Sequence, residues 1–379
     1  KGYRYSLVLG CSMAVILVCT PVIRIKRILK REISKSMNMK VAGNGNIYVM
    51  NEISKALMKS GIKTVKKVPS KVYSLPTKMI NGIVNIYKEK GYTSHDVVAV
   101  LRKVVGQKKI GHTGTLDPDA TGVLPVCLGK ATKLCDLLTD KDKTYEAVML
   151  LGMTTDTQDV TGRILEEKST ETLTADKVRE VIESFIGDYD QIPPMYSALK
   201  VNGKKLYELA REGKVVERKA RPVKILDIRI IEMDLPRVRM EISCSKGTYI
   251  RTLCHDIGEQ LGCGGCMESL IRTRVSAFQI KDAKTLEEIG ALKQEGMLEE
   301  ILVPIDEMFP LYPKITVKDD WKAFAKNGNP LDEKMLKDAD SQEEDRQVRL
   351  YEESGKFIAI YQWKEKEKKY HIVKMFFNE

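Results

Sequence analysis

Between residue 80 and about residue 300, the hydrophobic and polar positions follow the periods of strands and helices. Residues 80–88 (INGIVNIYK) alternate apolar and polar side chains, which predicts a β-strand. The turn residues GYTS follow, and Ser94 is expected to cap a helix over HDVVAVLRKVVG, because the valines and Leu101 of that segment form one apolar face. Two buried strands and an amphipathic helix are predicted over residues 144–152, 238–245 and 177–189, respectively.

After Leu302 the pattern changes to short alternating segments that are separated by charged or glycine-containing turns. These segments are KITV, RQVRLY, KFIAIYQW and KYHIVKMFF, and their spacing is typical of a small β-barrel. The run KEKEKK (364–369) is predicted to be a solvated hairpin turn. We therefore expect a domain boundary near residue 300, with one domain over 79–300 and a second over 301–379.

The N-terminal region differs from both. Residues 5–23 are strongly apolar, and five basic residues lie within 24–31. The run approaches the ~20 residues that span a bilayer, so a membrane anchor is physically possible, and the basic cluster would then hold the rest of the chain on the cytoplasmic side. The sequence lacks the small-residue cleavage pattern of a signal peptide. The alternative interpretation, which we favour, is that residues 1–78 are an accessory or fortuitous extension.

The charge balance adds a candidate partner. The chain has 63 Lys and Arg residues against 52 Asp and Glu residues, which gives a net charge of +11. This excess suits a polyanion such as nucleic acid, although surplus charge also keeps proteins soluble.

The eight cysteines lack the regular spacing of a secreted disulfide framework, which favours a reducing, cytoplasmic setting. Cys263 and Cys266 have the two-residue gap that zinc sites use, and His255 lies close by. However, Cys244 and Cys254 do not form a second close pair. The four cysteines are therefore expected to be small buried hydrophobic residues.

The segment GHTGTLDPDATG (111–122) is the candidate for chemistry. Its three glycines predict a shaped loop, and Pro118 biases Asp117 towards extended geometry. The glycine spacing fits neither a dinucleotide fingerprint nor a phosphate-binding loop. Taken alone, an aspartate in such a loop is a turn residue more often than a catalyst.

The same segment resembles the active-site motif of the tRNA pseudouridine synthase B family, which isomerises uridine 55 in the T-loop of tRNA. The resemblance covers about residues 79–300 and continues more weakly to the C-terminus. The other motifs that carry it, in family order, are NGIVNIYKEKGYTSHDVV (81–98), KTYEA (143–147), QIPPMYSALKVNGKKLYELAREG (191–213), SKGTYIRTLCHDIGEQLGCGG (245–265) and LIRTRVSAF (270–278).

The resemblance implies an α+β pseudouridine synthase fold, in which a mixed, mainly antiparallel sheet is flanked by helices. It also implies a C-terminal RNA-binding domain of PUA type. The expected substrate is tRNA, without cofactor or metal, and the expected protein is a cytoplasmic monomer. Family members usually begin near the position of Met79, and this is why residues 1–78 are expected to lie outside the enzyme.

The resemblance also implies a role for individual residues. Asp117 is the expected nucleophile, and Arg251 is expected to pair with it and to keep it ionised and oriented. Tyr145 matches a tyrosine that stacks on the target base and Tyr249 a second pocket residue, while Leu270 lines the apolar side of a pocket for a flipped base. Tyr249 and Arg251 are expected to face the same side of a strand.

His112 is expected to displace T-loop bases by stacking. The segment QIPPMYSALK is interpreted as a rigid connector without a catalytic role. Several lysines that flank the motifs are expected to meet phosphates, namely Lys88, Lys130, Lys133, Lys141 and Lys143.

Two positions depart from the family pattern. Tyr87–Glu89 (YKE) replace a common D-K-P, and Cys266 stands where many members carry histidine. Two other functions stay open from the sequence. The chain could be an RNA-binding or tRNA-folding module, or a relative that modifies rRNA within a guide-RNA complex. The KEKGYTSHDVV start and the short C-terminal domain favour a bacterial, protein-only enzyme.

Overall fold

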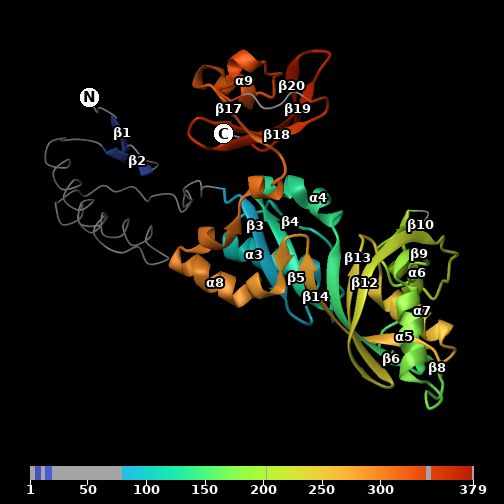
Figure 1. Cartoon of the computed structure of the whole chain (residues 1–379). Coiled ribbons are helices and arrows are strands. Elements are labelled where there is room, and N and C mark those ends of the chain that lie inside the picture. Colours follow the sequence, from blue (N-terminus) through green and yellow to red (C-terminus); the bar gives the residue numbers. More distant parts are fainter. Residues whose placement is uncertain (1–4, 10–12, 19–78, 202, 339–342, 378–379) are drawn as a thin grey trace, which may run out of the picture. The chain divides into compact units, whose positions relative to one another are not determined.

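The computed structural model describes residues 5–9, 13–18, 79–201, 203–338 and 343–377 (Figure 1). The chain divides into two compact units, Lys1–Met79 and Ile80–Glu379. In the first unit, β1 (Tyr5–Leu9) pairs antiparallel with β2 (Met13–Val18). Most of residues 1–78 lie outside the described part, so neither the membrane-anchor nor the accessory interpretation is tested. Within the described part, helices long and apolar enough to cross a membrane are absent.

The second unit is built on a mixed sheet of ten strands, eight of which form its continuous order. Neighbouring strands run antiparallel except β5 and β14, which pair in parallel. The prediction of a mixed, mainly antiparallel sheet is therefore confirmed. In spatial order the eight strands are β16 (Leu302–Val303), β3 (Gly82–Lys88), β5 (Thr121–Leu128), β14 (Gly265–Val275), β6 (Lys143–Leu151), β13 (Arg237–Cys244), β12 (Arg221–Asp234) and β9 (Gly187–Gln191). Two short strands pair at its side, β4 (Ile110–His112) with β5 and β15 (Phe278–Gln279) with β14.

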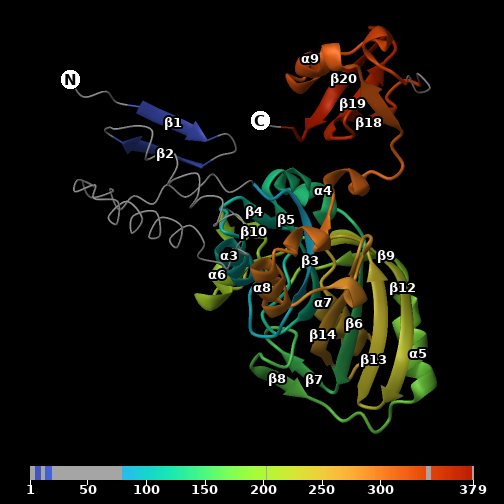
Figure 2. The same cartoon turned by 90° about the vertical axis from the view of Figure 1, so that its left-hand side faces the viewer.

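Helices cover this sheet and bury its apolar side chains in separate clusters. One cluster joins α5 (Ala175–Ser184) and α7 (Ile250–Gln260) to strands β6, β12 and β13. Another joins α3 (Ser94–Val105) and α8 (Leu286–Glu295) to strands β3 and β5. Figure 2 shows the long strands β6, β13 and β12 side by side. The sheet and its packed helices thus form the framework from which the loops of the site project.

The shorter elements of this part connect the sheet and its helices. They are η1 (Gly129–Leu134), α4 (Cys135–Thr139), β7 (Met153–Thr155), β8 (Ile164–Glu167), β10 (Lys200–Val201), β11 (Lys204–Lys205), α6 (Leu206–Arg211), η2 (Ile280–Asp282), η3 (Leu298–Ile301) and η4 (Ile305–Met308).

The C-terminal part has its own four-stranded sheet, in the order β17 (Lys314–Val317), β18 (Gln347–Glu352), β19 (Phe357–Lys364) and β20 (Lys369–Met375). The four alternating segments are therefore confirmed as strands. Lys364 pairs with Lys369 across the β19–β20 turn, which confirms the hairpin at KEKEKK. This part also contains η5 (Asp319–Trp321), α9 (Lys322–Lys326) and η6 (Glu333–Met335), and Tyr361 and Trp363 lie in its own apolar core.

Two element boundaries differ from the predictions. The cap of α3 is Thr93, which forms a capping box with Asp96, so the prediction of Ser94 as the cap is wrong. The predicted helix over 177–189 ends at Ser184, and β9 begins at Gly187, whose φ of 118° is accessible to glycine but rarely to other residues.

The four cysteines that could have suggested zinc are all buried, as expected of small hydrophobic residues. Within the described ranges, we find no group of three or more His, Cys, Asp or Glu residues that could hold a metal ion.

Candidate active site

Asp117 lies in the loop that joins β4 to β5, and the loop is fastened at several points. The Ser94 hydroxyl accepts the Leu116 N–H at 2.9 Å, and the Gly91 N–H donates to the Pro118 carbonyl at 2.9 Å. At the end of the loop, Gly122 has a φ of 104°, and a Cβ there would collide with the backbone of Arg272. Only glycine fits such a position, so this residue allows β5 and β14 to approach. The rigid loop that the glycines predicted is present.

Lys88 supports the loop through hydrogen bonds to its backbone. Its ammonium group is fully buried and donates to the carbonyls of Ala120 at 2.6 Å, Pro118 at 3.1 Å and Glu89 at 3.2 Å. Burial lowers the pKa of Lys88 to about 8, while the nearby Asp117 opposes this shift. The expectation that Lys88 meets phosphates is therefore wrong, because its three donors are already used inside the protein.

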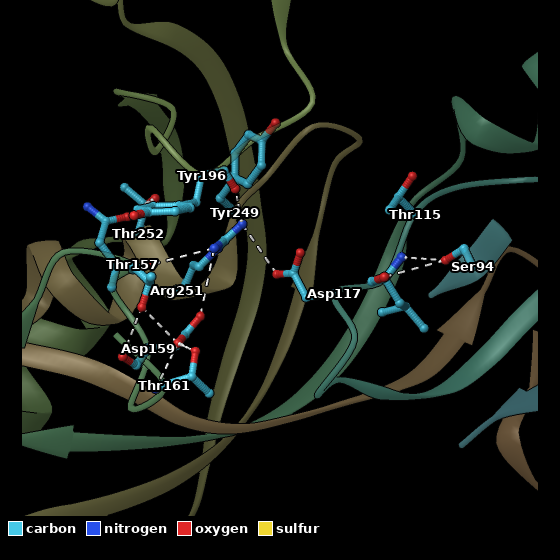
Figure 3. Close-up of polar contacts among 12 residues, drawn as sticks. Ser94, Thr115, Asp117, Thr157, Asp159, Thr161, Tyr196, Tyr249, Arg251 and Thr252 are labelled. Carbon is cyan, nitrogen blue, oxygen red and sulfur yellow. Dashed lines mark hydrogen bonds and ion pairs between the residues drawn. The ribbon is translucent and has the colours of Figure 1, made fainter. Parts of the chain in front are cut away.

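The Asp117 carboxylate faces the Arg251 guanidinium (Figure 3), with 3.3 Å between Oδ2 and Nη2. The Arg251 side chain is only 7% exposed, whereas that of Asp117 is 42% exposed. The buried guanidinium also donates to the carbonyls of Tyr196 at 2.7 Å and Thr157 at 3.4 Å. The arrangement leaves a carboxylate open to solvent and paired with a cation that is buried and hydrogen-bonded to two backbone carbonyls.

A second carboxylate, that of Asp159, lies on the other side of Arg251. The distance from Asp159 Oδ2 to Arg251 Nη1 is 3.7 Å. Asp159 is in turn fixed by the Thr157 hydroxyl at 2.8 Å and by the N–H of Thr161 at 3.0 Å (Figure 3). Sequence reasoning missed this residue, because the Thr- and Asp-rich segment TTDTQDVT equally predicts an ordinary turn.

Arg251 reaches this position from a helix, so the expectation that it shares a strand with Tyr249 is wrong. Tyr249 is the N-cap of α7, and Arg251 lies in the first turn of that helix. The helix forms because Ile250, Leu253 and Ile257 recur at helical spacing and are all buried.

Gln191 holds the backbone of Tyr249, the N-cap residue of α7, whose own side chain makes no capping hydrogen bond. The Gln191 amide accepts the Tyr249 N–H at 2.8 Å and donates to the Tyr249 carbonyl at 3.0 Å. The segment QIPPMYSALK, interpreted above as a connector only, thus supplies Gln191 and the Tyr196 carbonyl to the site. Its residue types gave no signal for this role.

The sheet brings Tyr145 and Leu270 to the same region. Tyr145 on β6 lies opposite Arg272 on β14, and Leu270 lies opposite Ala147 on the same pair of strands. Tyr145 is buried, and burial raises the pKa of its hydroxyl to about 12, while the charge of Asp117 adds to this shift. Burial also raises the pKa of Tyr249, and Asp117 again contributes. The fold therefore brings both tyrosines within the electrostatic reach of Asp117.

His112 ends β4 and is half-buried. Its Nδ1 accepts the Gly114 N–H at 3.3 Å, and its ring contacts the ring of His95 edge to face at 5.1 Å between centroids. Burial and the neighbouring His95 lower the pKa of His112, so the imidazole is neutral at pH 7. Its Nδ1 is therefore an acceptor, which leaves the Nε2 proton for other partners.

The remaining lysines have different surroundings. Lys143 is buried and donates to the Lys141 carbonyl at 2.6 Å and the Thr139 carbonyl at 2.9 Å, so the expectation of a phosphate contact is wrong for it. Lys133 donates to the Met375 carbonyl at 2.6 Å, and Lys130 lies over the Phe377 ring at 5.2 Å. For the exposed Lys141, a phosphate contact stays a prediction.

Comparison with known proteins defines the class of protein. Residues 102–250 match the family described as "TruB family pseudouridylate synthase (N terminal domain)", and residues 251–310 match the "tRNA pseudouridylate synthase B C-terminal domain". Among curated proteins, the tRNA pseudouridine synthase B of Lachnoclostridium phytofermentans is 55% identical over 78% of this chain and 100% of that protein. The protein of the same name from Alkaliphilus oremlandii is 48% identical over 76% of this chain and 91% of its own length.

The chain belongs to the TruB family of pseudouridylate synthases. Solved structures agree in fold. An H/ACA RNP bound to a substrate RNA containing 2′-deoxyuridine matches with a TM-score of 0.58 and 26% identity, over 78% of this chain and 85% of that one. The Cbf5–Nop10–Gar1 complex matches with a TM-score of 0.58 and 28% identity over the same shares.

Proposed function

We propose that this chain isomerises uridine to pseudouridine at position 55 in the T-loop of tRNA, with Asp117 as the nucleophile. The observation that carries this proposal is the half-exposed Asp117 carboxylate, 3.3 Å from the buried guanidinium of Arg251, in a chain of the TruB family. Binding alone would not require a carboxylate that is held at an open surface by a buried cation.

Each residue has a part in this proposal. Arg251 holds the Asp117 carboxylate, which attacks C1′ of the flipped nucleotide as the glycosidic bond to N1 breaks and the base takes the electron pair. The base then rotates between the walls formed by Tyr145 and Leu270. A bond forms from C5 to C1′ as the bond to Asp117 breaks, C5 loses its proton, and N1 gains one. The isomerisation consumes no redox equivalent. Attack on the base and elimination to a glycal are alternative routes to the same product.

Outside the pocket, His112 stacks against displaced T-loop bases in this proposal, and the C-terminal part (301–379) acts as a PUA-like RNA-binding domain. The protein works in the cytoplasm as a monomer without a protein partner. The chain is 48–55% identical to two proteins named tRNA pseudouridine synthase B, and 26–28% identical to the matched chains of the H/ACA RNP and the Cbf5–Nop10–Gar1 complex. This difference supports the protein-only enzyme over the guide-RNA alternative.

The test is conversion of a T-loop hairpin by the purified protein, without added metal or nucleotide. Wild type should form pseudouridine, and Asp117→Asn should lose the conversion while it keeps its affinity for the RNA. Full activity in Asp117→Asn would refute the role of the nucleophile, and inactivity of the wild type would refute the function.

We further propose that residues 1–78 lie outside the enzyme, as the family pattern suggests. A chain that begins at Met79 should then convert the hairpin at the same rate as the whole chain. A large loss of activity would contradict this.

A further inference from the structure

Arg272 on β14 is a fully buried charge that the mechanism above does not use. All of the acceptors that the described structure gives its guanidinium are uncharged oxygens, namely the carbonyls of Val123, Thr115 and Gly114. A buried cation is costly unless its donors are satisfied, and burial lowers the pKa of Arg272. A buried charge at this position is therefore expected to have a structural or catalytic role.

The three carbonyls lie on both sides of Asp117 along the chain. Nε donates to Val123 at 2.7 Å, at the start of β5, while Nη1 and Nη2 make longer bonds of 3.4 Å to Thr115 and Gly114 in the first part of the loop. Arg272 also pairs with Gly122 along the parallel strands β14 and β5. One planar group thus ties together the two ends of the loop.

The same guanidinium reaches the opposite wall of the site. Arg272 and Tyr145 are directly paired across β14 and β6, both residues are buried, and the positive charge of Arg272 acts to lower the pKa of the Tyr145 hydroxyl. Lys88 makes a different contact, because it holds only the middle of the loop at Pro118 and Ala120. Arg272 is therefore the group that connects the loop of the nucleophile to the tyrosine proposed to face the base.

We propose that Arg272 is a positioning residue for the isomerisation, whose guanidinium fixes the Asp117 loop relative to the Tyr145 ring. The inference rests on the proposed function, because it concerns the geometry of that reaction. Arginine is suited to this task because its planar fork presents five donors in fixed directions, whereas a lysine ammonium is a point charge on a flexible stem. A lysine at position 272 would keep the positive charge but should not hold the loop and the Tyr145 ring in the same geometry.

The test compares Arg272→Lys with Arg274→Lys, a matched change two residues along β14. Arg274 is hydrogen-bonded to Thr144 Oγ1 at 3.0 Å and to the Ser276 carbonyl at 3.3 Å, outside the loop. The measurements are the single-turnover rate of pseudouridine formation at saturating T-loop hairpin, the Kd for the hairpin and the thermal midpoint of each protein. The rate of Arg272→Lys should fall by about tenfold or more, because even a small displacement of reacting groups slows a reaction strongly. The Kd of this variant should stay within about twofold of wild type.

A second variant keeps the inference testable if Arg272→Lys fails to fold. Tyr145→Phe removes the hydroxyl on which the charge of Arg272 acts and keeps the ring, so it should lower the single-turnover rate without weakening RNA binding. In the Arg272→Lys background the same change should cost little more, since the guanidinium that interacts with that hydroxyl is already absent.

Three results would overturn the positioning role. The first is a rate for Arg272→Lys equal to that of Arg274→Lys, the second is an effect of Arg272→Lys on the affinity for RNA alone, and the third is strict additivity of Arg272→Lys and Tyr145→Phe. If Arg272→Lys does not fold, an unchanged rate for Tyr145→Phe takes the place of these three. These outcomes are distinct from failure of the proposed function. An inactive wild type would refute that function and this inference with it, whereas an active wild type with a normal Arg272→Lys would refute the inference alone.

Discussion

Replacement of Gln191 by methionine tests whether a residue far from the nucleophile in sequence supports Arg251. Methionine keeps the length of the side chain and removes both of its hydrogen bonds to Tyr249. The Tyr249 carbonyl retains its bond from the Leu253 N–H at 3.1 Å, but the Tyr249 N–H loses its acceptor at Gln191. Because Gln191 is only 1% exposed, water has little access to replace that acceptor.

The expected loss of stability in Gln191→Met follows from these contacts. A buried unsatisfied N–H costs about 1–3 kcal/mol, and the loss of the other hydrogen bond costs about 1 kcal/mol. We therefore expect Gln191→Met to lower the free energy of unfolding by about 2–4 kcal/mol. Because the first turn of α7 carries Arg251, the same change should also slow pseudouridine formation, even at temperatures where the variant is fully folded.

The assay combines denaturant unfolding with single-turnover conversion of a T-loop hairpin. The matched control is Gln260→Met on the same helix, where the exposed amide makes only a 3.5 Å contact to Ser184 and the expected change is within about 0.5 kcal/mol. A Gln191→Met protein with the stability and rate of this control would refute the argument that Gln191 fixes the start of α7.

Two other predictions concern the charges of the site. Asp159→Asn should reduce the single-turnover rate more than the affinity for RNA, because it removes the second carboxylate beside the Arg251 guanidinium while the two Thr contacts can persist; an unchanged rate would contradict this role. His112 has a pKa lowered in the folded state, so its contribution to stability should be full above about pH 6.5 and lost as the pH falls through the folded pKa. The difference in unfolding free energy between wild type and His112→Asn, measured from pH 8 to pH 5, should therefore shrink at acid pH, and a constant difference would count against the neutral imidazole.

The spacing of apolar and polar residues predicted the elements whose side chains are buried at regular intervals. The strands β6 and β13 and the four C-terminal strands were predictable, because their periods reflect burial on a sheet. Boundaries were less predictable. Ser94 and Thr93 are both good capping residues, and the hydroxyl of Ser94 is instead used by Leu116, which is 22 residues away.

The burial of charged groups could not be predicted from residue type. Lysine and arginine are normally exposed, yet Lys88 and Arg272 are fully buried. They are accommodated because backbone carbonyls accept their hydrogen bonds, most of them from segments distant in the sequence, as in the bond from Arg272 to Val123, which spans 149 residues. Such contacts leave no local periodicity in the sequence.

The sequence by itself determined the family motifs, the mixture of strands and helices, and the candidate residues Asp117, Arg251 and Tyr145. Only the tertiary structure decided how Arg251 is held, since Asp159 and Gln191 lie 92 and 60 positions from it in the chain. It also decided that Arg251 lies in the first turn of a helix. The physical reason is that hydrogen bonds and ion pairs depend on distance in space, and a chain of this length brings together segments whose separation in sequence carries no information about that distance.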